Sequence, residues 1–475
     1  MPHFTQFAKE FFENRRLDPR AYSVYPNSVR PVKGGLLYMA DGGEEDVLVV
    51  RELGGFAGER VDGVLQAPLS HENARALRAL LPFTAPAKVL SRDQSCGVGD
   101  RLGIAAPGHI RVFERCDVSP VLAQQSMREL SLTNRSYPDV VDTATFGVFR
   151  AGYTAGFGAD GDHLKTLPDI QTALDAGCSM ITLDCSEHIQ PPHPVAPDPG
   201  MERDYLNRVF RAEDEEIRFT ARDLDEARAV YGDVIAFAKE VYDTFFAGPD
   251  SPAELEISID ETGEPTTPQQ HFFIAAELRR LGVRFVTLAP RFVGEFQKGV
   301  DYIGDLDAFE RDFKIHAAIA QHFQYKLSIH SGSDKFSVFP IIAKYTNGKF
   351  HLKTAGTSWL EAMRIAAKTD PALYRRAHKL ALETFAEAKK YYHVTTDLSK
   401  IPPLETLSDD ALPALFDQND ARQLIHITYG FILGDPDLKS RLYALWRRER
   451  QAYSDALYRH IGRHIELITA TSLRK

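Results

Sequence analysis

Short runs of β-forming residues alternate with longer helical patterns along the middle of this chain. The runs that we expect to be strands span residues 143–149, 179–183, 255–259, 284–288, 326–329 and 350–354. Such alternation is typical of parallel strands joined by crossover helices. At least six strand–helix units between residues 143 and 368 favour a barrel over a compact doubly wound sheet. The sequence therefore predicts an α/β fold built on a TIM-like (β/α) barrel.

One of the crossover helices has clear signals at both ends. Thr267 stands at the expected N-cap, Pro268 at the first helical position, and Gln270 where it completes a capping box. An apolar run follows, and Gly282 stands where the helix is expected to stop. We therefore predict a helix that begins at Pro268 and ends before Gly282.

The predicted barrel lies between two regions of different character. Residues 1–140 mix strand-like runs, such as 47–50 and 89–90, with a glycine-rich turn at 96–103, which indicates an α+β extension packed on the barrel. Residues 141–370 form the predicted catalytic barrel. Residues 371–475 carry a mostly helical pattern. A chain of 475 residues is long enough to bury a large core.

The charge balance and the cysteines exclude several classes of protein. The chain has 56 Lys and Arg against 66 Asp and Glu, a formal net charge of −10, and its basic residues are scattered among the acids. Nucleic acid is therefore disfavoured as a partner. No apolar run reaches the length of about eighteen residues that a membrane span needs. The four cysteines have no C-x-x-C spacing and the N-terminus has no apolar signal core, so we expect a cytoplasmic protein. The sequence leaves its oligomeric state open.

Ionisable side chains follow almost every predicted strand. In (β/α) barrels the catalytic groups lie at the C-terminal ends of the strands. The segments in question are 160–165 (DGDHLK), 184–188 (DCSEH), 260–262 (DET), 291–298 and 330–335 (HSGSDK). A single acid after a strand often only caps the next helix, so the convergence of several segments on one face is the stronger indication. His163 and His330, with an oxygen donor between them, would suit zinc, manganese or iron.

Two other patterns are weaker candidates. Residues 156–161 match G-x-G-x-x-G, and Asp184 follows at a distance suited to a ribose ligand. However, no helix is predicted to begin at these glycines, and Asp160 and Asp162 would repel a pyrophosphate. His460 and His464 have the i, i+4 spacing of a zinc-binding pair. We expect these two histidines to lie on an exposed helix face.

Several blocks of the sequence resemble, in order, the motifs of the tagaturonate epimerase family. The blocks are CGVGDRLG at 96–103 with PGHI at 107–110, DGDHLK at 160–165, QKGVDY at 297–302 and HSGSDK at 330–335. The resemblance extends over nearly the whole chain. It implies a metal-dependent enzyme of hexuronate catabolism that interconverts D-tagaturonate and D-fructuronate.

That reaction limits the machinery that an enzyme can use. The two ketohexuronates differ at a carbinol carbon β to the ketone, so simple enolisation does not invert it. Two routes remain, which are retro-aldol cleavage followed by re-addition, and transient oxidation of the hydroxyl by a nicotinamide. The retro-aldol route needs a metal and a base. The chain offers candidates for both and only the doubtful glycine segment for a nicotinamide, so we favour the metal route.

The resemblance and the strand ends together suggest roles for particular residues. The expected ligands of a divalent metal cation are His163, Gln297 and His330. A neutral amide is a weak metal ligand, so Asp184 or Glu187 is the expected third ligand if Gln297 does not bind the metal. The expected acid/base pair is Asp162 and Glu261. The residues expected to bind the anionic substrate are Arg101, Lys165 and Lys335 through charge, and Ser126 through a hydrogen bond to a hydroxyl.

Three alternatives remain at this point. A metal-dependent aldose–ketose isomerase on a similar barrel would use enolisation or a hydride shift. A glycoside hydrolase could use a carboxylate pair such as Asp184 and Glu261, although only two tryptophans are available for a sugar platform. A non-catalytic protein that binds sugar acids would need fewer acid/base groups than this chain provides.

Overall fold

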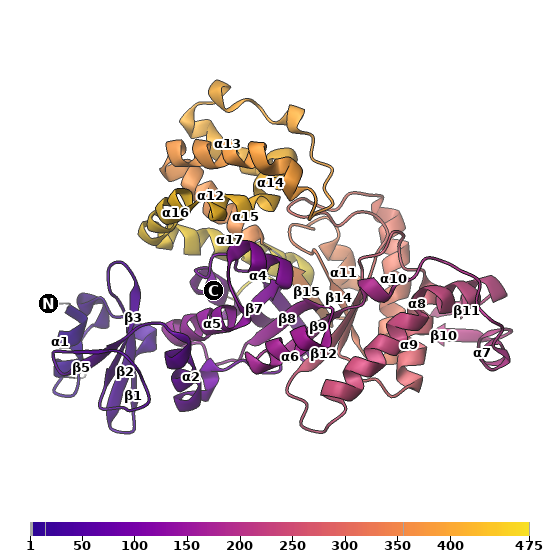
Figure 1. Ribbon diagram of the computed structural model, residues 1–475, viewed down its shortest axis with the longest axis horizontal. Coiled ribbons are helices and arrows are strands. Elements are labelled where there is room, and N and C mark those ends of the chain that lie inside the picture. The colour runs from indigo at the N-terminus through magenta and orange to yellow at the C-terminus, as the bar shows by residue number, and fades with distance from the viewer. Residues whose placement is uncertain (1–2, 15, 355, 475) are drawn as a thin grey trace.

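A closed barrel lies at the centre of the molecule (Figure 1). The computed structural model describes residues 3–14, 16–354 and 356–474. Within these residues, eight parallel strands close the barrel in the order β6 (Gln94–Val98), β7 (Ser119–Ser126), β8 (Gly158–Leu164), β9 (Met180–Asp184), β12 (Glu254–Ile259), β13 (Thr287–Pro290), β14 (Lys326–Ile329) and β15 (Phe350–Thr354). β15 pairs with β6, so Phe350 lies opposite Gln94. The predicted TIM-like α/β barrel is confirmed.

The barrel begins earlier in the chain than the predicted boundary at residue 140. β6 occupies part of the expected glycine-rich turn, and β7 also lies within the expected extension. Gly97 does not make a turn here, because it is a residue of β6 where a Cβ would lie 1.6 Å from Oε1 of Gln124. The glycine therefore allows close packing inside the barrel. Residues 89–90 are loop and not strand, and the Leu90 amide donates to the buried carboxylate of Glu254.

The expected first barrel strand, residues 143–149, is part of helix α5 (Tyr137–Ala151). Ser136 and Asp139 form a capping box at its start, and Gly152 ends it in the left-handed region with φ 68°. The β-branched and aromatic residues of this segment have strand propensity, but the caps and the packing of one face against the barrel fix a helix. By contrast, α9 (Pro268–Arg280) has the predicted capping box.

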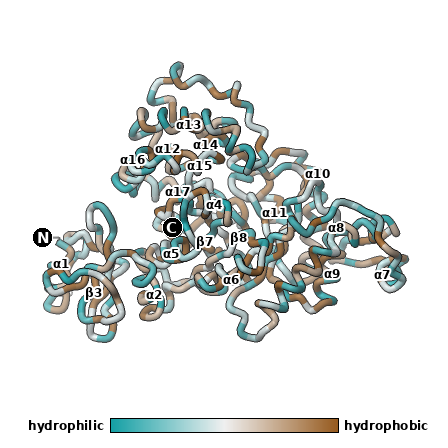
Figure 2. Tube along the Cα trace, in the orientation of Figure 1, coloured by the Kyte–Doolittle hydropathy of each residue, from teal (hydrophilic) through white to brown (hydrophobic). Residues whose placement is uncertain are grey.

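Helices surround the barrel, and a small hairpin extends from it. The remaining helices of this layer are α3 (Ala106–Phe113), α4 (Met127–Thr133), α6 (Leu167–Asp175), α7 (Pro199–Tyr205), α8 (Ala221–Val241), α10 (Leu306–Phe323) and α11 (Phe339–Tyr345). The hairpin pairs β10 (Val209–Ala212) with β11 (Glu215–Arg218). In Figure 2 apolar stretches gather around the barrel strands, whereas the outer turns are mostly hydrophilic. The main hydrophobic core therefore lies between the strands and these helices.

A smaller α+β unit precedes the barrel at the left of Figure 1. It contains α1 (His3–Glu10) and α2 (His71–Leu80). Its antiparallel sheet has the strand order β1 (Arg30–Val32), β2 (Gly35–Asp41), β3 (Asp46–Arg51), β5 (Val64–Ala67) and β4 (Glu59–Val61). One face of this sheet packs with α1, and the other packs with α2 and α5.

The chain after β15 is mostly helical, as expected. Its helices are α12 (Thr357–Thr369), α13 (Pro371–Ala388), α14 (Asn419–Ile427), α15 (Tyr429–Gly434), α16 (Pro436–Arg448) and α17 (Arg450–Thr469). They have a hydrophobic core of their own, in which the rings of Trp359 and Trp446 meet edge to face at 5.9 Å. α17 also packs on α3 and α11 of the barrel.

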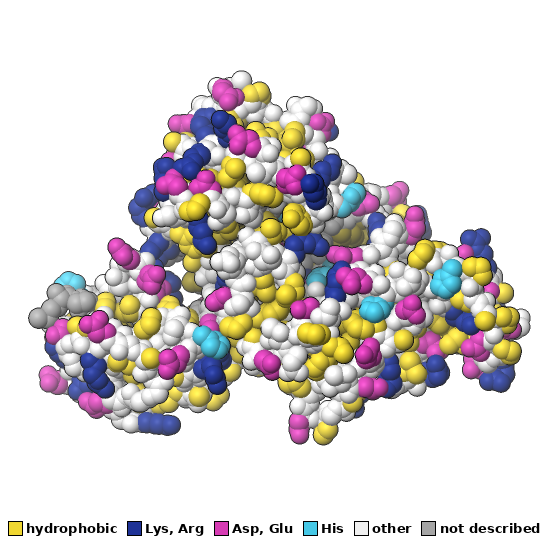
Figure 3. All heavy atoms as spheres, in the orientation of Figure 1, with side chains coloured by type: hydrophobic (Ala, Val, Ile, Leu, Met, Phe, Trp, Pro, Cys, Tyr) yellow, Lys and Arg dark blue, Asp and Glu magenta, His cyan; other side chains and the backbone are white. Residues whose placement is uncertain are grey.

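The surface carries mixed charges. Figure 3 shows acidic and basic side chains interspersed over the face in view. None of the helices within the described residues is long and apolar enough to cross a membrane.

Candidate active site

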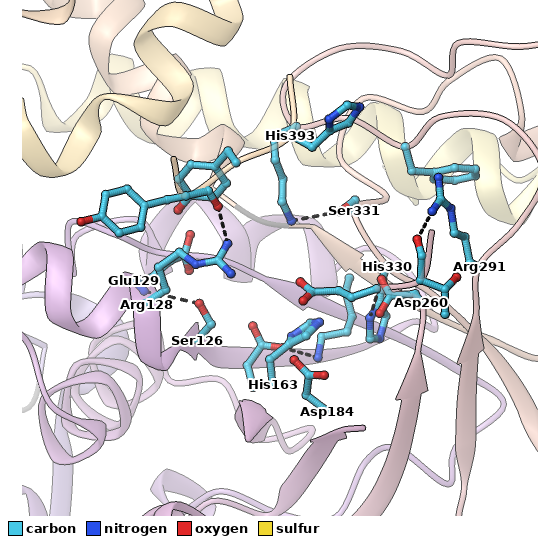
Figure 4. Close-up of a pocket in the computed structure, with 18 of the residues that line it drawn as sticks. Ser126, Arg128, Glu129, His163, Asp184, Asp260, Arg291, His330, Ser331 and His393 are labelled. Carbon is cyan, nitrogen blue, oxygen red and sulfur yellow. Dashed lines mark hydrogen bonds and ion pairs between the residues drawn. The ribbon is translucent and has the colours of Figure 1, made fainter. Parts of the chain in front are cut away.

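A cavity of about 960 Å³ opens where the barrel strands end. It is lined by side chains that lie at or just beyond the C-terminal ends of β7, β8, β9, β12, β13 and β14 (Figure 4). Of the residues singled out from the sequence, it brings together Arg101, Ser126, Asp162, His163, Lys165, Asp184, Glu187, Glu261, Gln297 and His330. The convergence expected from the strand ends is therefore present in the fold.

His163 owes its position to an irregularity in β8. The register of β8 against β9 shifts between Gly161 and Leu164, and His163 has φ 58°. A non-glycine residue in the left-handed region is uncommon and is often found at functional sites. Nδ1 of His163 lies 2.7 Å from Oδ1 of Asp162, which leaves Nε2 as its possible ligand atom.

His330 follows β14 and is held in a similar way. Its Nε2 lies 2.8 Å from Oε1 of Glu256, a buried residue of β12. Its Nδ1 is buried without a hydrogen-bond partner and lies 3.4 Å from Oδ2 of Asp260. The rings of His163 and His330 have their centroids 4.9 Å apart.

These two histidines and Asp260 form a group that could hold a metal ion. One ligand atom from each residue lies within 4.8 Å of the others. Each imidazole bonds a carboxylate through one ring nitrogen, an arrangement that fixes the orientation of metal-binding histidines. Two imidazoles and a carboxylate are a donor set for zinc, manganese or iron. The residues present therefore fit a divalent cation.

The structure does not bring Gln297 into this group. Its side-chain oxygen accepts hydrogen bonds from the amide and the hydroxyl of Thr395, both at 3.0 Å, and from Gln423. Neither suggested replacement belongs to the group either, since Asp184 and Glu187 both lie beside the ammonium of Lys165 at 3.6 Å. Asp260 is the oxygen donor that the structure brings close to the two histidines.

Lys353 connects the carboxylates that orient the two histidines. Its ammonium contacts Asp160 at 2.8 Å and Glu256 at 3.3 Å, and it also contacts Asp162. Burial alone would raise the pKa of Asp162, but Lys353 and His163 hold that pKa well below its ordinary value. Burial raises the pKa of Asp160 to about 6, against the opposing charge of Lys353. One buried ammonium thus contacts three carboxylates, two of which orient the histidines.

The two residues expected to form an acid/base pair differ in environment. Asp162 is buried, and its Oδ1 is already bonded to His163 and Lys353. Glu261 is an exposed residue of the cavity wall, and within the described residues its carboxylate has no hydrogen-bond or ion-pair partner. Glu261 is therefore the member of the pair whose carboxylate is open to a molecule in the cavity.

The expected substrate-binding cations are already engaged. Arg101 is buried, donates to Glu129 and to the carbonyl of His426 at 2.8 Å, and stacks 3.7 Å over the ring of Tyr429. Lys335 does not line the cavity. Its ammonium is fully buried and donates to carbonyl groups of the surrounding loop, those of Gln297, Val300 and Ser333.

Ser126 does line the cavity. Its hydroxyl oxygen caps α4 by accepting a hydrogen bond from the amide of Glu129. The hydroxyl proton is not used by this cap, so Ser126 keeps a donor for a bound molecule.

Sequence reasoning missed Glu256 and Lys353, which belong to predicted strands and not to the segments after them. Both are charged residues inside short apolar runs. In a barrel strand alternate residues face the interior, so a charge inside such a run points to a polar barrel interior. That signal was available in the sequence. Asp260 stood in one of the strand-end segments but was not chosen as a ligand.

The glycine segment at 156–161 leads into β8 and not into a helix. A Cβ at Gly161 would lie 2.8 Å from Ile181 and 2.9 Å from Ala173, so this glycine serves close packing. The strand–turn–helix context that a dinucleotide-binding fingerprint requires is therefore missing at these residues.

The prediction that His460 and His464 are exposed was wrong. His464 is fully buried because α17 packs on the barrel. Its Nε2 accepts a hydrogen bond from the amide of Asp334 at 2.9 Å, and its Nδ1 is hydrogen-bonded to the carbonyl of His460 at 2.8 Å. These two residues and Asp334 lie close enough to hold a metal ion, but both ring nitrogens of His464 are already used. The group joins α17 to the end of β14.

A closed (β/α) barrel with imidazole and carboxylate groups around a cavity at its C-terminal end is the architecture of a TIM-barrel enzyme. Comparison with known proteins makes this assignment specific. The family model of tagaturonate epimerase matches residues 25–468. The chain belongs to the tagaturonate epimerase family, a family of isomerases, and the resemblance seen in the sequence is confirmed.

Individual relatives are similar to this protein along nearly the whole chain. A tagaturonate/fructuronate epimerase of Thermotoga maritima is 40% identical over 471 residues, which cover 94% of this chain and 97% of the relative. The native crystal structure of the fructuronate-tagaturonate epimerase UxaE from Cohnella laeviribosi matches with a TM-score of 0.92 and 44% identity over 98% of this chain and 99% of that one. A glycerol complex of the same enzyme matches with a TM-score of 0.91 and 46% identity, covering 94% and 96%.

Proposed function

We propose that this protein interconverts D-tagaturonate and D-fructuronate in hexuronate catabolism, with a divalent metal cation held by His163, Asp260 and His330. The observation that carries the metal site is the convergence of their ligand atoms within 4.8 Å. The Nδ1 atom of His330 supports it, because this buried atom makes no hydrogen bond although the carboxylate of Asp260 lies 3.4 Å away, as expected of two ligands of one ion. The names of the relatives support the substrate pair.

The chemistry follows from the difference between the two sugars. The inverted carbon carries a hydroxyl and lies β to the ketone. In the retro-aldol route a base removes the proton of this hydroxyl, and the bond between the α and β carbons breaks. The aldehyde fragment rotates, and the same bond forms again on its other face. A bound divalent cation would stabilise the negative charge that develops on the ketone side.

Three residues of the cavity are proposed to have different roles in the reaction. Glu261 is proposed to exchange the proton of the β-hydroxyl, since its carboxylate faces the cavity without another partner. Asp162 remains ionised, orients His163 and keeps one oxygen for the substrate. Ser126 is proposed to donate its hydroxyl proton to a substrate hydroxyl.

Turnover before and after metal removal tests this function. Purified protein would receive D-tagaturonate before and after treatment with EDTA, with Zn²⁺, Mn²⁺, Fe²⁺ or NAD added back separately. We expect formation of D-fructuronate that is lost on chelation and restored by a metal alone. Activity that survives verified metal removal, or that needs NAD, would contradict the proposed metal route.

Glu261→Gln tests the proton-transfer role. The amide has nearly the same shape but does not accept the hydroxyl proton, so we expect kcat to fall by about 100-fold or more with metal content unchanged. Glu187→Gln, at another exposed carboxylate of the cavity, is the matched control. A kcat near that of the unmodified protein would show that Glu261 plays no part in proton transfer.

The cysteines support a reducing compartment such as the cytoplasm. All four are free thiols, and Cys96, Cys178 and Cys185 are buried. A chain of this size that uses no disulfide among its described residues suits a cellular environment that keeps thiols reduced.

A further inference from the structure

The candidate cavity has an excess of acidic groups, although the proposed substrate is itself an anion. The carboxylates that line it belong to Glu129, Asp162, Asp169, Asp184, Glu187, Asp260, Glu261 and Glu295. The Arg and Lys side chains that line it are Arg101, Arg128, Lys165, Arg291, Lys298 and Lys353. A sugar carboxylate therefore needs a cation whose charge is not already compensated.

Most of these cations already have acidic partners. Arg101 pairs with Glu129, and Lys165 lies between Asp184 and Glu187. Lys353 contacts three buried carboxylates. Arg291 lies 3.7 Å from Glu295 and donates to the carbonyl of Thr262. Among the described residues, Arg128 and Lys298 make no ion pair with a carboxylate. The carboxylates of Glu129, Asp162, Asp260 and Glu261 act on the Lys298 ammonium only at longer range.

Lys298 is half-buried in the wall of the cavity and is held in place from both ends. Its ammonium donates to the hydroxyl of Ser331 at 2.9 Å, the bond drawn at Ser331 in Figure 4. Its carbonyl accepts from Gln423 at 3.2 Å, and the carbonyl of the next residue, Gly299, accepts from Arg422 at 2.8 Å. The backbone that carries the ammonium is thus fixed before a ligand arrives, which lowers the entropic cost of binding.

Ser331 places this ammonium next to the candidate metal group. The residue follows His330 directly and has φ 49°, in the left-handed region. A strained backbone at a residue whose side chain lines a cavity is a feature of functional positions. A carboxylate bound at Lys298 would lie beside the end of β14, close to the groups proposed for the reaction.

Arg128 is the competing cation. It is exposed, donates to the carbonyl of Tyr391 at 2.9 Å and stacks 5.2 Å over the ring of Tyr392. Its guanidinium is therefore better hydrated than the Lys298 ammonium. Charge pairs gain strength as water is excluded from around them, so the half-buried ammonium is the stronger site.

We propose that Lys298, positioned by Ser331, binds the carboxylate of the sugar and makes the cavity selective for ketohexuronates over neutral ketohexoses. This inference rests on the proposed function and adds the group that determines its substrate class.

The test compares Lys298→Met and Lys298→Arg with the unmodified enzyme, all loaded with the same metal. Calorimetry would measure the dissociation constants of D-fructuronate and of D-fructose, and steady-state kinetics would give KM and kcat for D-fructuronate. We expect Lys298→Met to weaken D-fructuronate binding by about 10- to 100-fold, the effect of one charge-assisted hydrogen bond. Binding of D-fructose should change by less than about twofold, and Lys298→Arg should retain part of the discrimination.

Two further variants make the outcome decisive. Lys344→Met removes an exposed lysine outside the cavity and is the matched control. Arg128→Met tests the competing cation. The inference would be overturned if Lys298→Met bound both sugars equally more weakly, or if it kept the full preference for D-fructuronate over D-fructose. It would also be overturned if that preference were lost in Arg128→Met alone. If Lys298→Met does not fold, the discrimination of Lys298→Arg decides.

The two proposals fail in different ways. If the unmodified protein turns over ketohexuronates while Lys298→Met keeps its preference for the charged sugar, the inference fails and the function stands. If the unmodified protein binds D-fructuronate selectively through Lys298 but does not epimerise it, the inference stands and the function fails.

Discussion

Replacing His330 by alanine is expected to abolish metal binding and turnover while the barrel stays folded. The variant loses the buried Nδ1 that lies 3.4 Å from Asp260, and with it one of two imidazole donors. The carboxylate of Glu256 keeps its contact with Lys353 at 3.3 Å, and that of Asp260 keeps its hydrogen bond from Ser258, so each carboxylate that loses His330 retains one partner. Loss of an electrophilic metal removes several kcal/mol of transition-state stabilisation, so kcat/KM should fall by about 1,000-fold or more.

The measurement is metal content by elemental analysis, together with activity and a thermal unfolding curve. His193→Ala, at an exposed histidine of the loop after β9, is the matched control and should retain both metal and activity. Full metal occupancy in His330→Ala would remove this residue from the proposed ligand set.

Replacing Lys353 by methionine is expected to be the most damaging substitution for stability. The change leaves Asp160, Asp162 and Glu256 buried close together without their shared ammonium. Breaking a buried ion pair by removing one partner costs about 3–5 kcal/mol. Because two of these carboxylates orient the histidines, metal affinity should fall as well. Chemical unfolding and metal titration would measure the two effects.

A double variant separates the effect of the lost charge in Lys353→Met from the effect of the changed side-chain shape. Adding Asp160→Asn to Lys353→Met removes one of the stranded carboxylates, so we expect part of the lost stability to return. Activity should not return, because Asp162 and Glu256 still lack the ammonium that fixes them. Lys344→Met serves as the control for loss of an exposed lysine. A Lys353→Met variant as stable as the unmodified protein would refute the central role of this ammonium.

Much of the site could be predicted because it depends on local patterns. Glu261 and His330 each follow a short apolar run, and the ends of parallel strands converge in a closed barrel whatever the exact connections are. His163 lies within β8 itself, because the run that was expected to precede it is part of helix α5. The same reasoning recovered Asp162 and Ser126 as residues of the cavity. The capping residues of α9 likewise act on their immediate neighbours, so its start could be predicted from the sequence.

The contacts that the sequence did not indicate are made with distant residues. The oxygen of Gln297 is taken by Thr395, and the ammonium of Lys335 by carbonyl groups of a folded loop. No spacing in the sequence announces such partners. Gly97 was interpreted as a turn residue because its reason for being glycine, the side chain of Gln124, becomes visible only when β6 and β7 lie side by side.

Closure of the barrel between β15 and β6 has a consequence for how the enzyme is made. During synthesis from the N-terminus, β6 leaves the ribosome long before its partner β15, and pairing between such distant segments is slow. Lys353 arrives with that last strand, after the acids of β8 and β12 that it compensates. A growing chain therefore carries a cluster of mutually repelling acids until the final strand docks. Closure of the barrel thus also brings in the ammonium that holds the site together, and we expect a chain that ends before β15 to be inactive.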